Sequence, residues 1–321
     1  MKNIEQIAQE REIINNTIRS CLSEQGSVEV ETPLLVASPG MEPNLFPFET
    51  RVLEPNKESH RAGLITSPEY SMKKLLGQGM QKIFTITKVF RNMEELGGQH
   101  NPEFSMLEWY EQGSDYHVCL DQTEQMIRRC AKALGIDAPA AFERKALKEL
   151  FLEHAEVDLE KSDRSALLQD CMRLGISAEE SDSESDLFYG IFLSKIEPTF
   201  EGKNIFVCDY PKYQAALAAL TPDGKFGQRF ELYMNGLELC NGFTELTDPD
   251  EQRHRFEEEA IERKEPGKIV FPIDETLLEL LGSIQNPTFG NALGIDRLHM
   301  VLTGRSSISD VLLFPAKELF S

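Results

Sequence analysis

The amino-acid sequence predicts an α+β fold in which helices flank an antiparallel β-sheet. Residues 81–110 and 230–243 are each typical of two strands joined by a turn, and such hairpins build antiparallel sheets. Helical patterns lie at both ends of the chain, over residues 4–24 and 295–302. Strands joined by hairpins, with helices outside them, favour α+β over an alternating parallel arrangement.

The first predicted elements are a helix, a strand and a second helix. Apolar residues recur on one face of residues 4–24, as in an amphipathic helix. Valines alternate with glutamates over residues 28–31, which is typical of a strand, and Pro33 ends it. A further helix is expected to open at Pro68 and to reach Leu76.

Two hairpins are expected at the centre of the sheet. Residues 81–91 and 104–110 are rich in β-favouring side chains and flank a polar loop. The second hairpin turns at Asn235 and Gly236, a pair that suits a tight turn.

The remaining segments are expected to be mostly helical. Helices are predicted near residues 118–134, 187–196 and 252–264. A strand at residues 290–294 leads into the last helix. Residues 1–321 suit one main domain, in which residues 115–200 form a helical insertion.

Composition and charge exclude several classes of protein. The net charge of −21 repels phosphate backbones, so a large nucleic-acid surface is not expected. No apolar run approaches the length of a membrane span and the N-terminus has no apolar signal core, so we expect a cytoplasmic protein. The six cysteines include no C-x-x-C pair, so neither a structural zinc site nor disulfides are expected.

Side chains around the loop of the first hairpin suggest a ligand site. Arg91 at a strand end can hold a carboxylate or a phosphate through two hydrogen bonds. His100 and Asn101 across the loop add donors, and Phe104 offers an aromatic face for a base. The alternative is a surface hairpin with polar tips, and these residues alone do not decide between the two.

Carboxylates on the second hairpin suggest a metal site. Glu231 and Glu238 can meet across the turn, and two carboxylates on one sheet face suit Mg²⁺. Asn241, Phe243 and Glu245 share one strand face, but Glu238 is out of step with them, so one common pocket requires a bulge. The alternative is an exposed acidic face. Apolar neighbours favour the site, because embedded acids need partners.

The third feature is the strand–helix junction at residues 290–297. Its small residues let a ligand approach the backbone. Arg297 lies in the first turn of a helix, where the helix dipole disfavours a cation, and this suggests contact with a nucleotide. The alternative is a junction in which Arg297 pairs with Asp296 or another acid.

These features, in this order, resemble the three signature motifs of class II aminoacyl-tRNA synthetases. Residues 26–33 resemble motif 1, whose proline lies at the dimer interface in that family. Residues 90–108 resemble motif 2, and residues 290–297 resemble motif 3. The segments most similar to lysyl-tRNA synthetases are residues 67–69, 100–110 and 238–246.

The chain also resembles a group of shortened lysyl-tRNA synthetase paralogues that attach lysine to elongation factor P. It begins about 25 residues before motif 1, so no N-terminal anticodon-binding domain is expected. The resemblance covers nearly the whole chain and thins over residues 115–200. The segments that match the paralogues best are residues 46–51, 107–110, 211–215 and 292–294.

The resemblance implies an ATP-dependent ligase with the class II synthetase catalytic fold, acting as a homodimer. Such an enzyme activates lysine or β-lysine as an adenylate, with ATP and Mg²⁺, and passes it to a lysine of elongation factor P rather than to tRNA. Arg91 and Arg297 are the implied catalytic residues, and Phe104 and Arg297 would sandwich the adenine. The implied ATP-binding residues are Arg91, Asn92, Met93, Glu94, His100, Asn101, Phe104, Glu238, Leu239, Gly294 and Arg297.

The same resemblance implies an acidic amino-acid pocket. Glu69 would take the amino group near the substrate carboxylate, Glu108, Tyr110 and Glu245 the side-chain ammonium, and Asn241 the carboxylate. The implied Mg²⁺ ligands are Glu231 and Glu238. The implied substrate-binding residues are Ser67, Pro68, Glu69, Glu108, Tyr110, Asn241, Phe243 and Glu245.

Several positions depart from the family pattern. The motif 2 loop is one residue longer than usual, and Met93 stands where glutamate is usual, so Glu94 is expected to take that role through a bulged loop. Gln99 replaces an arginine, which removes one cationic phosphate contact, and Ala292 replaces a glycine. Two alternatives therefore stay open: a related enzyme with another acceptor, such as tRNA or a small amine, and a non-catalytic regulatory paralogue.

Overall fold

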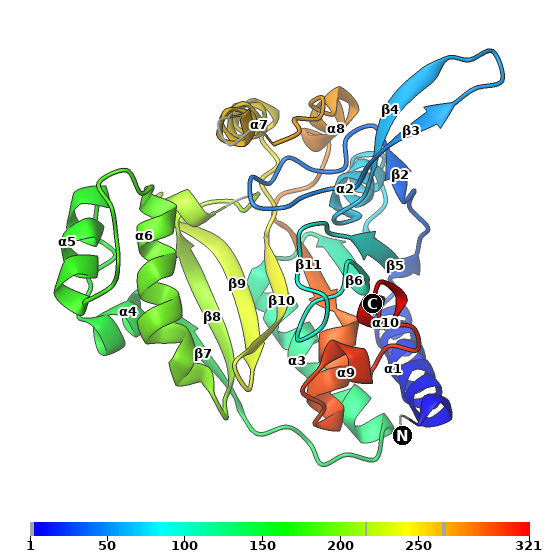
Figure 1. Ribbon diagram of the computed structural model, residues 1–321, viewed down its shortest axis with the longest axis horizontal. Helices are drawn as coiled ribbons and strands as arrows, with labels where there is room; N and C mark the ends of the chain where they lie inside the picture. The colour runs from blue at the N-terminus through cyan, green and yellow to red at the C-terminus, as the bar shows by residue number, and fades with distance from the viewer. Residues whose placement is uncertain (1–2, 216, 265–267) are drawn as a thin grey trace.

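The structure, a computed structural model, describes residues 3–215, 217–264 and 268–321. Its centre is an eight-stranded sheet with the order β1-β5-β6-β11-β10-β9-β8-β7 (Figure 1). All pairs are antiparallel except β1 with β5 and β7 with β8 at the two edges, which confirms the predicted sheet. The strands are β1 (Val28–Glu29), β5 (Lys82–Phe90), β6 (Glu103–Gln112), β7 (Phe142–Ala146), β8 (Asn204–Pro211), β9 (Phe226–Met234), β10 (Leu237–Thr244) and β11 (Thr288–Gly294).

Helices pack on both faces of this sheet. Phe84 and Trp109 pack with α1, α3 and α9, whereas their neighbours Ile83 and Tyr110 pack with α2 and α8 on the opposite face, as strand alternation requires. The helices are α1 (Ile4–Glu24), α2 (Glu69–Gly77), α3 (Tyr116–Ala133), α4 (Leu147–Ala155), α5 (Arg164–Leu174), α6 (Glu184–Ile191), α7 (Pro249–Lys264), α8 (Glu275–Leu281), α9 (Ile295–Thr303) and α10 (Ala316–Leu319). Short helical turns lie at Phe192–Ile196, Glu197–Phe200, Lys212–Gln214 and Ile308–Asp310.

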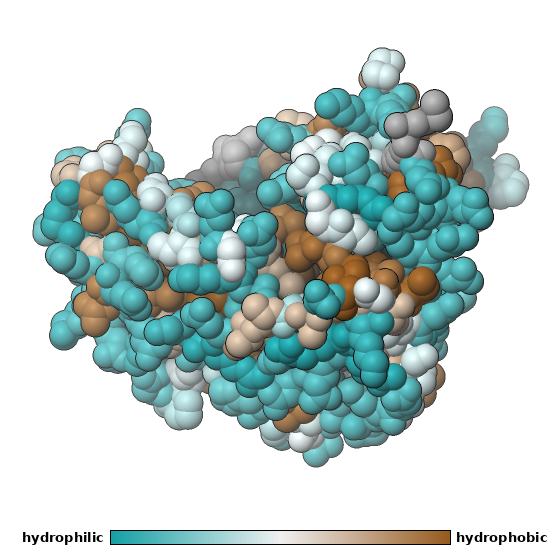
Figure 2. Space-filling view, turned by 90° about the horizontal axis from the view of Figure 1, so that it is seen from below, coloured by the Kyte–Doolittle hydropathy of each residue, from teal (hydrophilic) through white to brown (hydrophobic). Residues whose placement is uncertain are grey.

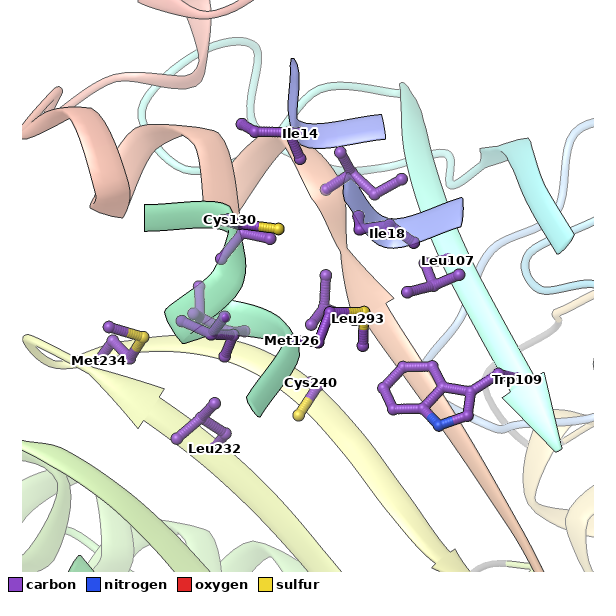
Figure 3. Packing of buried hydrophobic residues seen from close by; sticks show 14 of the residues in the cluster. Ile14, Ile18, Leu107, Trp109, Met126, Cys130, Leu232, Met234, Cys240 and Leu293 are labelled. Atoms are coloured by element: carbon purple, nitrogen blue, oxygen red, sulfur yellow. The ribbon is translucent and has the colours of Figure 1, made fainter. Parts of the chain in front are cut away.

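The core beneath the cleft described below joins the first helix to the middle of the sheet. Ile14 and Ile18 of α1 point towards β6 and β11, and α3 closes the space beside them (Figure 3). Trp109 is 1% exposed. All six cysteines are buried free thiols. This layer gives the strands that carry the functional side chains a rigid support.

A second, three-stranded sheet has the order β2-β4-β3 and ends in a hairpin that projects from the body (Figure 1). Its strands are β2 (Leu35–Val36), β3 (Glu49–Leu53) and β4 (Ser59–Leu64). The sequence patterns predicted only loop and short strands in this region.

Both predicted hairpins are confirmed, as β5–β6 and β9–β10, and so are the helices α1, α2 and α9. The strand predicted over residues 28–31 is shorter, because β1 is an exposed edge strand that pairs only with β5. The helix predicted from residue 187 begins earlier, at Glu184, because Ser183 and Asp186 form a capping box there.

Candidate active site

A cleft of about 940 Å³ lies over the face of the main sheet that carries Tyr110. β6, β10 and β11 contribute its floor, while α7, the loop at residues 42–45 and the helical turn Lys212–Gln214 contribute its walls. Most of the predicted site residues therefore line one cavity, although they come from distant parts of the sequence. These are Ser67, Glu69, Arg91, Glu94, His100, Asn101, Phe104, Glu108, Tyr110, Glu238, Leu239, Asn241, Phe243, Gly294 and Arg297.

One end of the cleft is cationic. The guanidinium carbon of Arg91 lies 5.2 Å from the centre of the Phe104 ring. The Nε of Arg91 is buried and has no hydrogen-bond partner among the described residues. Burial lowers the pKa of Arg91, although the nearby carboxylates of Glu238, Glu42 and Glu94 oppose the shift. A phosphate or a carboxylate would supply the missing partner.

Arg297 is held in place by β10 and by the loop of the first hairpin. Its Nη1 donates to the Glu238 carbonyl at 3.0 Å, and its Nη2 lies 2.9 Å from Nε2 of His100. Burial, with Arg297 beside it, lowers the pKa of His100, so the imidazole accepts this bond as a neutral ring. Asp296 instead pairs with Arg11 and accepts from the Ser105 amide, so it is not the partner of Arg297. The other half of that alternative, a pair with another acid, is met by Glu238, whose Oε2 lies 3.9 Å from Nη1 of Arg297.

In the loop between the two strands of this hairpin, Glu94 lines both the cleft and a second cavity, whereas Met93 lines only the second cavity. Glu94 lines the cleft, and its Oε2 lies 3.5 Å from Nε2 of His100. Met93 has a left-handed backbone conformation, is 78% exposed and lines a different cavity, together with Asn92. Glu94 therefore occupies the position expected of it, whereas the structure does not bring the Asn92 and Met93 side chains into the cleft.

Asn101 lines the cleft but already makes two bonds. Its amide group donates to the Glu103 carbonyl at 2.6 Å, and its Oδ1 accepts from the Ala316 amide at 2.9 Å. Its role in the structure is to tie the hairpin to α10.

The other end of the cleft is acidic and more deeply buried. Glu108 is 1% exposed and accepts hydrogen bonds from the Ser67 hydroxyl and from the Tyr110 hydroxyl, the latter at 2.8 Å. Burial, with Glu69 nearby, raises the pKa of Glu108 to about 8. Pro68 does not line the cleft; it is the N-cap residue of α2 and leads directly into Glu69.

Glu245 lies just beneath the cleft surface, under Gly290. A Cβ atom at Gly290 would lie 2.1 Å from Glu245 Oε1 and 2.3 Å from the Tyr110 ring, so only glycine fits there. The Oε1 of Glu245 is buried and has no hydrogen-bond partner among the described residues. Burial raises the pKa of Glu245 to about 8, although Lys73 opposes the shift. Glu245 itself does not line the cleft, so its assignment to the substrate ammonium stays a prediction.

Asn241 is oriented by a neighbour that the sequence patterns did not assign a role. The Nε of Arg229 donates to Asn241 Oδ1 at 3.0 Å. Because a guanidinium only donates, the amide oxygen must face Arg229, and the amide nitrogen is left to donate elsewhere. Arg229 also donates to Glu231, which shares its strand face.

The predicted bulge is present between Glu238 and Cys240, and it separates the two proposed Mg²⁺ ligands. Glu238 faces the cleft, and the nearest cation contact is Nη1 of Arg297 at 3.9 Å. Glu231 is 6% exposed and does not line the cleft. Its carboxylate accepts from Arg229, from the Tyr210 hydroxyl at 2.6 Å and from the Tyr233 hydroxyl at 2.7 Å.

Lys73 was missed as a functional candidate, and Arg229, which belongs to the same group of residues as Glu231 in the sequence, was given no role. A signal for both was present in their spacing. Lys73 follows Glu69 by four residues in a helix, and Arg229 precedes Glu231 by two residues in a strand, so each shares a face with a predicted site residue.

Among the described residues, no helix is long and apolar enough to cross a membrane.

Comparison with known proteins places this geometry in a family. The family model of class II tRNA synthetases (D, K and N) matches residues 1–318. The elongation factor P–(R)-β-lysine ligase of Salmonella typhi is 37% identical over 309 residues, which cover 95% of this chain and 93% of that protein. Ligases of the same name from Yersinia enterocolitica and Erwinia tasmaniensis are 36% and 37% identical, with the same coverage. The chain therefore belongs to the class II tRNA synthetase family.

Proposed function

We propose that this chain is an ATP-dependent ligase that activates lysine or β-lysine as an aminoacyl adenylate and transfers it to a lysine side chain of elongation factor P. The observation that carries the proposal is the two-ended cleft, with the unpaired Arg91 at one end and buried carboxylates at the other. ATP and an amino acid with two ammonium groups suit such a cleft, head to tail. The names of the relatives support β-lysine as the isomer and elongation factor P as the acceptor.

Each residue of the cleft would act by position and charge. Arg91 would hold the α-phosphate and the substrate carboxylate together, while Phe104 and Arg297 would enclose the adenine. A carboxylate oxygen would then form a bond to the α-phosphorus as the bond to pyrophosphate breaks. In the second step the amine of the acceptor lysine would attack the acyl carbon, and AMP would leave. Neither step requires a covalent nucleophile from this chain.

The residues present fit one Mg²⁺ ion, mainly through Glu238. Burial, with Glu231 close by, raises the pKa of Glu238 to about 7, so a divalent cation would stabilise its carboxylate form. Glu231 already accepts three hydrogen bonds, which leaves it at most one further bond as a ligand. The bound ion would neutralise phosphate charge.

The acceptor is tested by incubating the protein with ATP, labelled lysine or β-lysine, and purified elongation factor P. The proposal expects label on one lysine of the factor, located by mass spectrometry, and none on tRNA in a parallel reaction. Label on tRNA instead would favour the related enzyme with another acceptor. Absence of amino-acid-dependent exchange between ATP and pyrophosphate would favour the non-catalytic paralogue.

We also propose that the protein works as a homodimer in the cytoplasm. A second cavity, of about 1050 Å³, lies between α1 and the C-terminal segment, and it is lined by Phe314, Leu319 and Phe320, which are 78%, 63% and 75% exposed. Figure 2 shows hydrophobic residues gathered on one face of an otherwise mostly hydrophilic surface. Soluble monomers rarely expose large apolar areas, so a second copy is the proposed cover. Residues 1–321 would act as one catalytic domain, and the proposed insertion at residues 115–200 would be helical apart from β7, which joins the main sheet beside β8.

A further inference from the structure

Lys73 is a buried cation at the acidic end of the cleft. Its side chain is 1% exposed, and its Nζ lies 2.6 Å from Oε1 of Glu69 and 2.7 Å from Oε2 of Glu245. It also lies 5.6 Å from the centre of the Phe243 ring. A buried lysine normally loses its charge, but here the two carboxylates raise its pKa, so it stays an ammonium.

This cation joins two residues that would hold different parts of the substrate. Glu69 would take the amino group near the substrate carboxylate, and Glu245 would take the ammonium at the far end. Because both carboxylates contact one nitrogen, their spacing and their charge depend on Lys73. The third carboxylate, Glu108, has no ion pair among the described residues; its bonds come from two hydroxyls.

Lys73 compensates part of the negative charge at this end of the cleft. When ionised, Glu69, Glu108 and Glu245 carry three negative charges, and Lys73 cancels one of them. Burial and neighbouring carboxylates, Glu69 among them, raise the pKa of Glu42 and of Glu259, which also line the cleft, so this end keeps an excess of negative charge. Buried charges are tolerated only when they are paired, so this excess favours a substrate that supplies cations.

We propose that Lys73 is a specificity-determining residue: it is a fixed internal counter-ion that compensates one carboxylate charge at the acidic end of the cleft and holds Glu69 and Glu245 at a set spacing. The inference rests on the proposed function, because it takes lysine or β-lysine as the substrate. Lys73 acts through the two glutamates and is a positioning residue rather than a catalytic one.

The test replaces Lys73 by methionine and counts protons. The titratable groups around this nitrogen and its two partners are Glu69 on α2, Glu108 and Tyr110 on β6, Glu245 after β10, Glu42 in the loop before β3, and Glu259 on α7. Without Lys73, one further carboxyl must keep a proton until the substrate arrives. Calorimetry of amino-acid binding in buffers of different ionisation enthalpy should then detect about one more proton released per lysine bound than in the unsubstituted protein, at neutral pH.

Kinetics supply the second measurement. In amino-acid-dependent exchange between ATP and pyrophosphate, Lys73→Met should raise the KM for lysine about tenfold and move its pH dependence about one unit upward, with the KM for ATP within about twofold. Lys73→Arg keeps the charge and should restore the pH dependence. Lys74→Met is the matched control, because Lys74 is the next residue of α2 but pairs with Asp274 outside the cleft.

The outcomes separate this inference from the proposed function. An unchanged proton count and pH dependence in a folded Lys73→Met variant overturn the role of Lys73 and leave the proposed function standing. If the unsubstituted protein binds neither isomer, the proposed function fails and this inference fails with it. If Lys73→Met unfolds, the test rests on Lys73→Arg alone. The pH dependence of the KM for lysine in Lys73→Arg must then match that of the unsubstituted protein.

Discussion

The two ends of the cleft are built in opposite ways. At the nucleotide end the charged groups are partly exposed, and Arg91 has no ion pair among the described residues. At the amino-acid end Lys73, Glu108 and Glu245 are each about 1% exposed, and hydrogen bonds or ion pairs fix them within the protein. The first end is poised to receive an anion, whereas the second is organised before the substrate arrives.

This difference has an energetic origin. A phosphate brings several charges and its own metal ion, so the protein need only present a cation and flat surfaces. An ammonium is small and strongly hydrated, so its site must replace water with buried acceptors at fixed positions. We therefore expect substitutions at the two ends to affect different kinetic constants.

The largest effect is expected at the nucleotide end. Arg91→Ala should reduce exchange between ATP and pyrophosphate about a thousandfold or more, because the only unpaired guanidinium recorded at this end, within the described chain, is lost. Circular dichroism should show an intact fold. Arg51→Ala, on the projecting hairpin, is the control. Exchange that survives Arg91→Ala would show that the phosphate site lies elsewhere.

Glu245→Gln should affect the amino-acid end selectively. Losing a charge-assisted bond costs about 1.5–3 kcal/mol, so the KM for lysine should rise roughly 10- to 100-fold. The KM for ATP should change far less. Equal changes in both constants would contradict the assignment of Glu245 to the substrate ammonium.

Glu238→Gln should weaken the use of Mg²⁺. We expect the Mg²⁺ concentration for half-maximal exchange to rise about tenfold, because the carboxylate that faces the cleft is lost. Glu153→Gln, at an exposed position of α4, should leave this concentration unchanged. Glu231→Gln gives an informative contrast. If Glu231 mainly orients Arg229, its loss should raise the KM for the amino acid more than the Mg²⁺ requirement.

The smallest effect is a pH dependence at the amino-acid end. Glu108 and Glu245 have pKa values of about 8, so below that pH each tends to hold a proton and accepts poorly from an ammonium. A bound ammonium lowers both pKa values, so binding releases protons and strengthens as pH rises towards about 8. The KM for lysine should fall several-fold from about pH 6.5 to 8, measured against a nearly constant KM for ATP. A KM for lysine that is flat or rises over this range would contradict the raised pKa values.

The elements that could be predicted from the sequence are those whose apolar periodicity or turn residues match the structure. The two hairpins, α1 and α9 followed from periodicity and turn residues, and the bulge before Asn241 followed from strand alternation. The helix boundary at Glu184 was missed because a cap outweighed the apolar pattern. The projecting hairpin has little apolar alternation and could not be recognised as such.

The site was less predictable where a side chain has two possible directions. Met93 and Glu94 are adjacent in one loop, and only the backbone conformation decides which of them enters the cleft. Glu231 was expected as an equal metal ligand, but Tyr210 and Tyr233 occupy its carboxylate. The spacing of Lys73 relates it to Glu69 only. Its role as a partner of both Glu69 and Glu245 could not be predicted, because these two glutamates are far apart in the sequence and contact the same nitrogen only in the fold.

The most direct test is exchange between ATP and pyrophosphate, run side by side with lysine, β-lysine and a neutral amino acid of similar length, such as norleucine. We predict robust exchange with at least one of the two lysine isomers and none with norleucine, because norleucine lacks the second ammonium group that the buried Glu108 and Glu245 would hold. Exchange that requires neither isomer, or that norleucine supports equally well, would contradict the account of the cleft as a site for a dicationic amino acid.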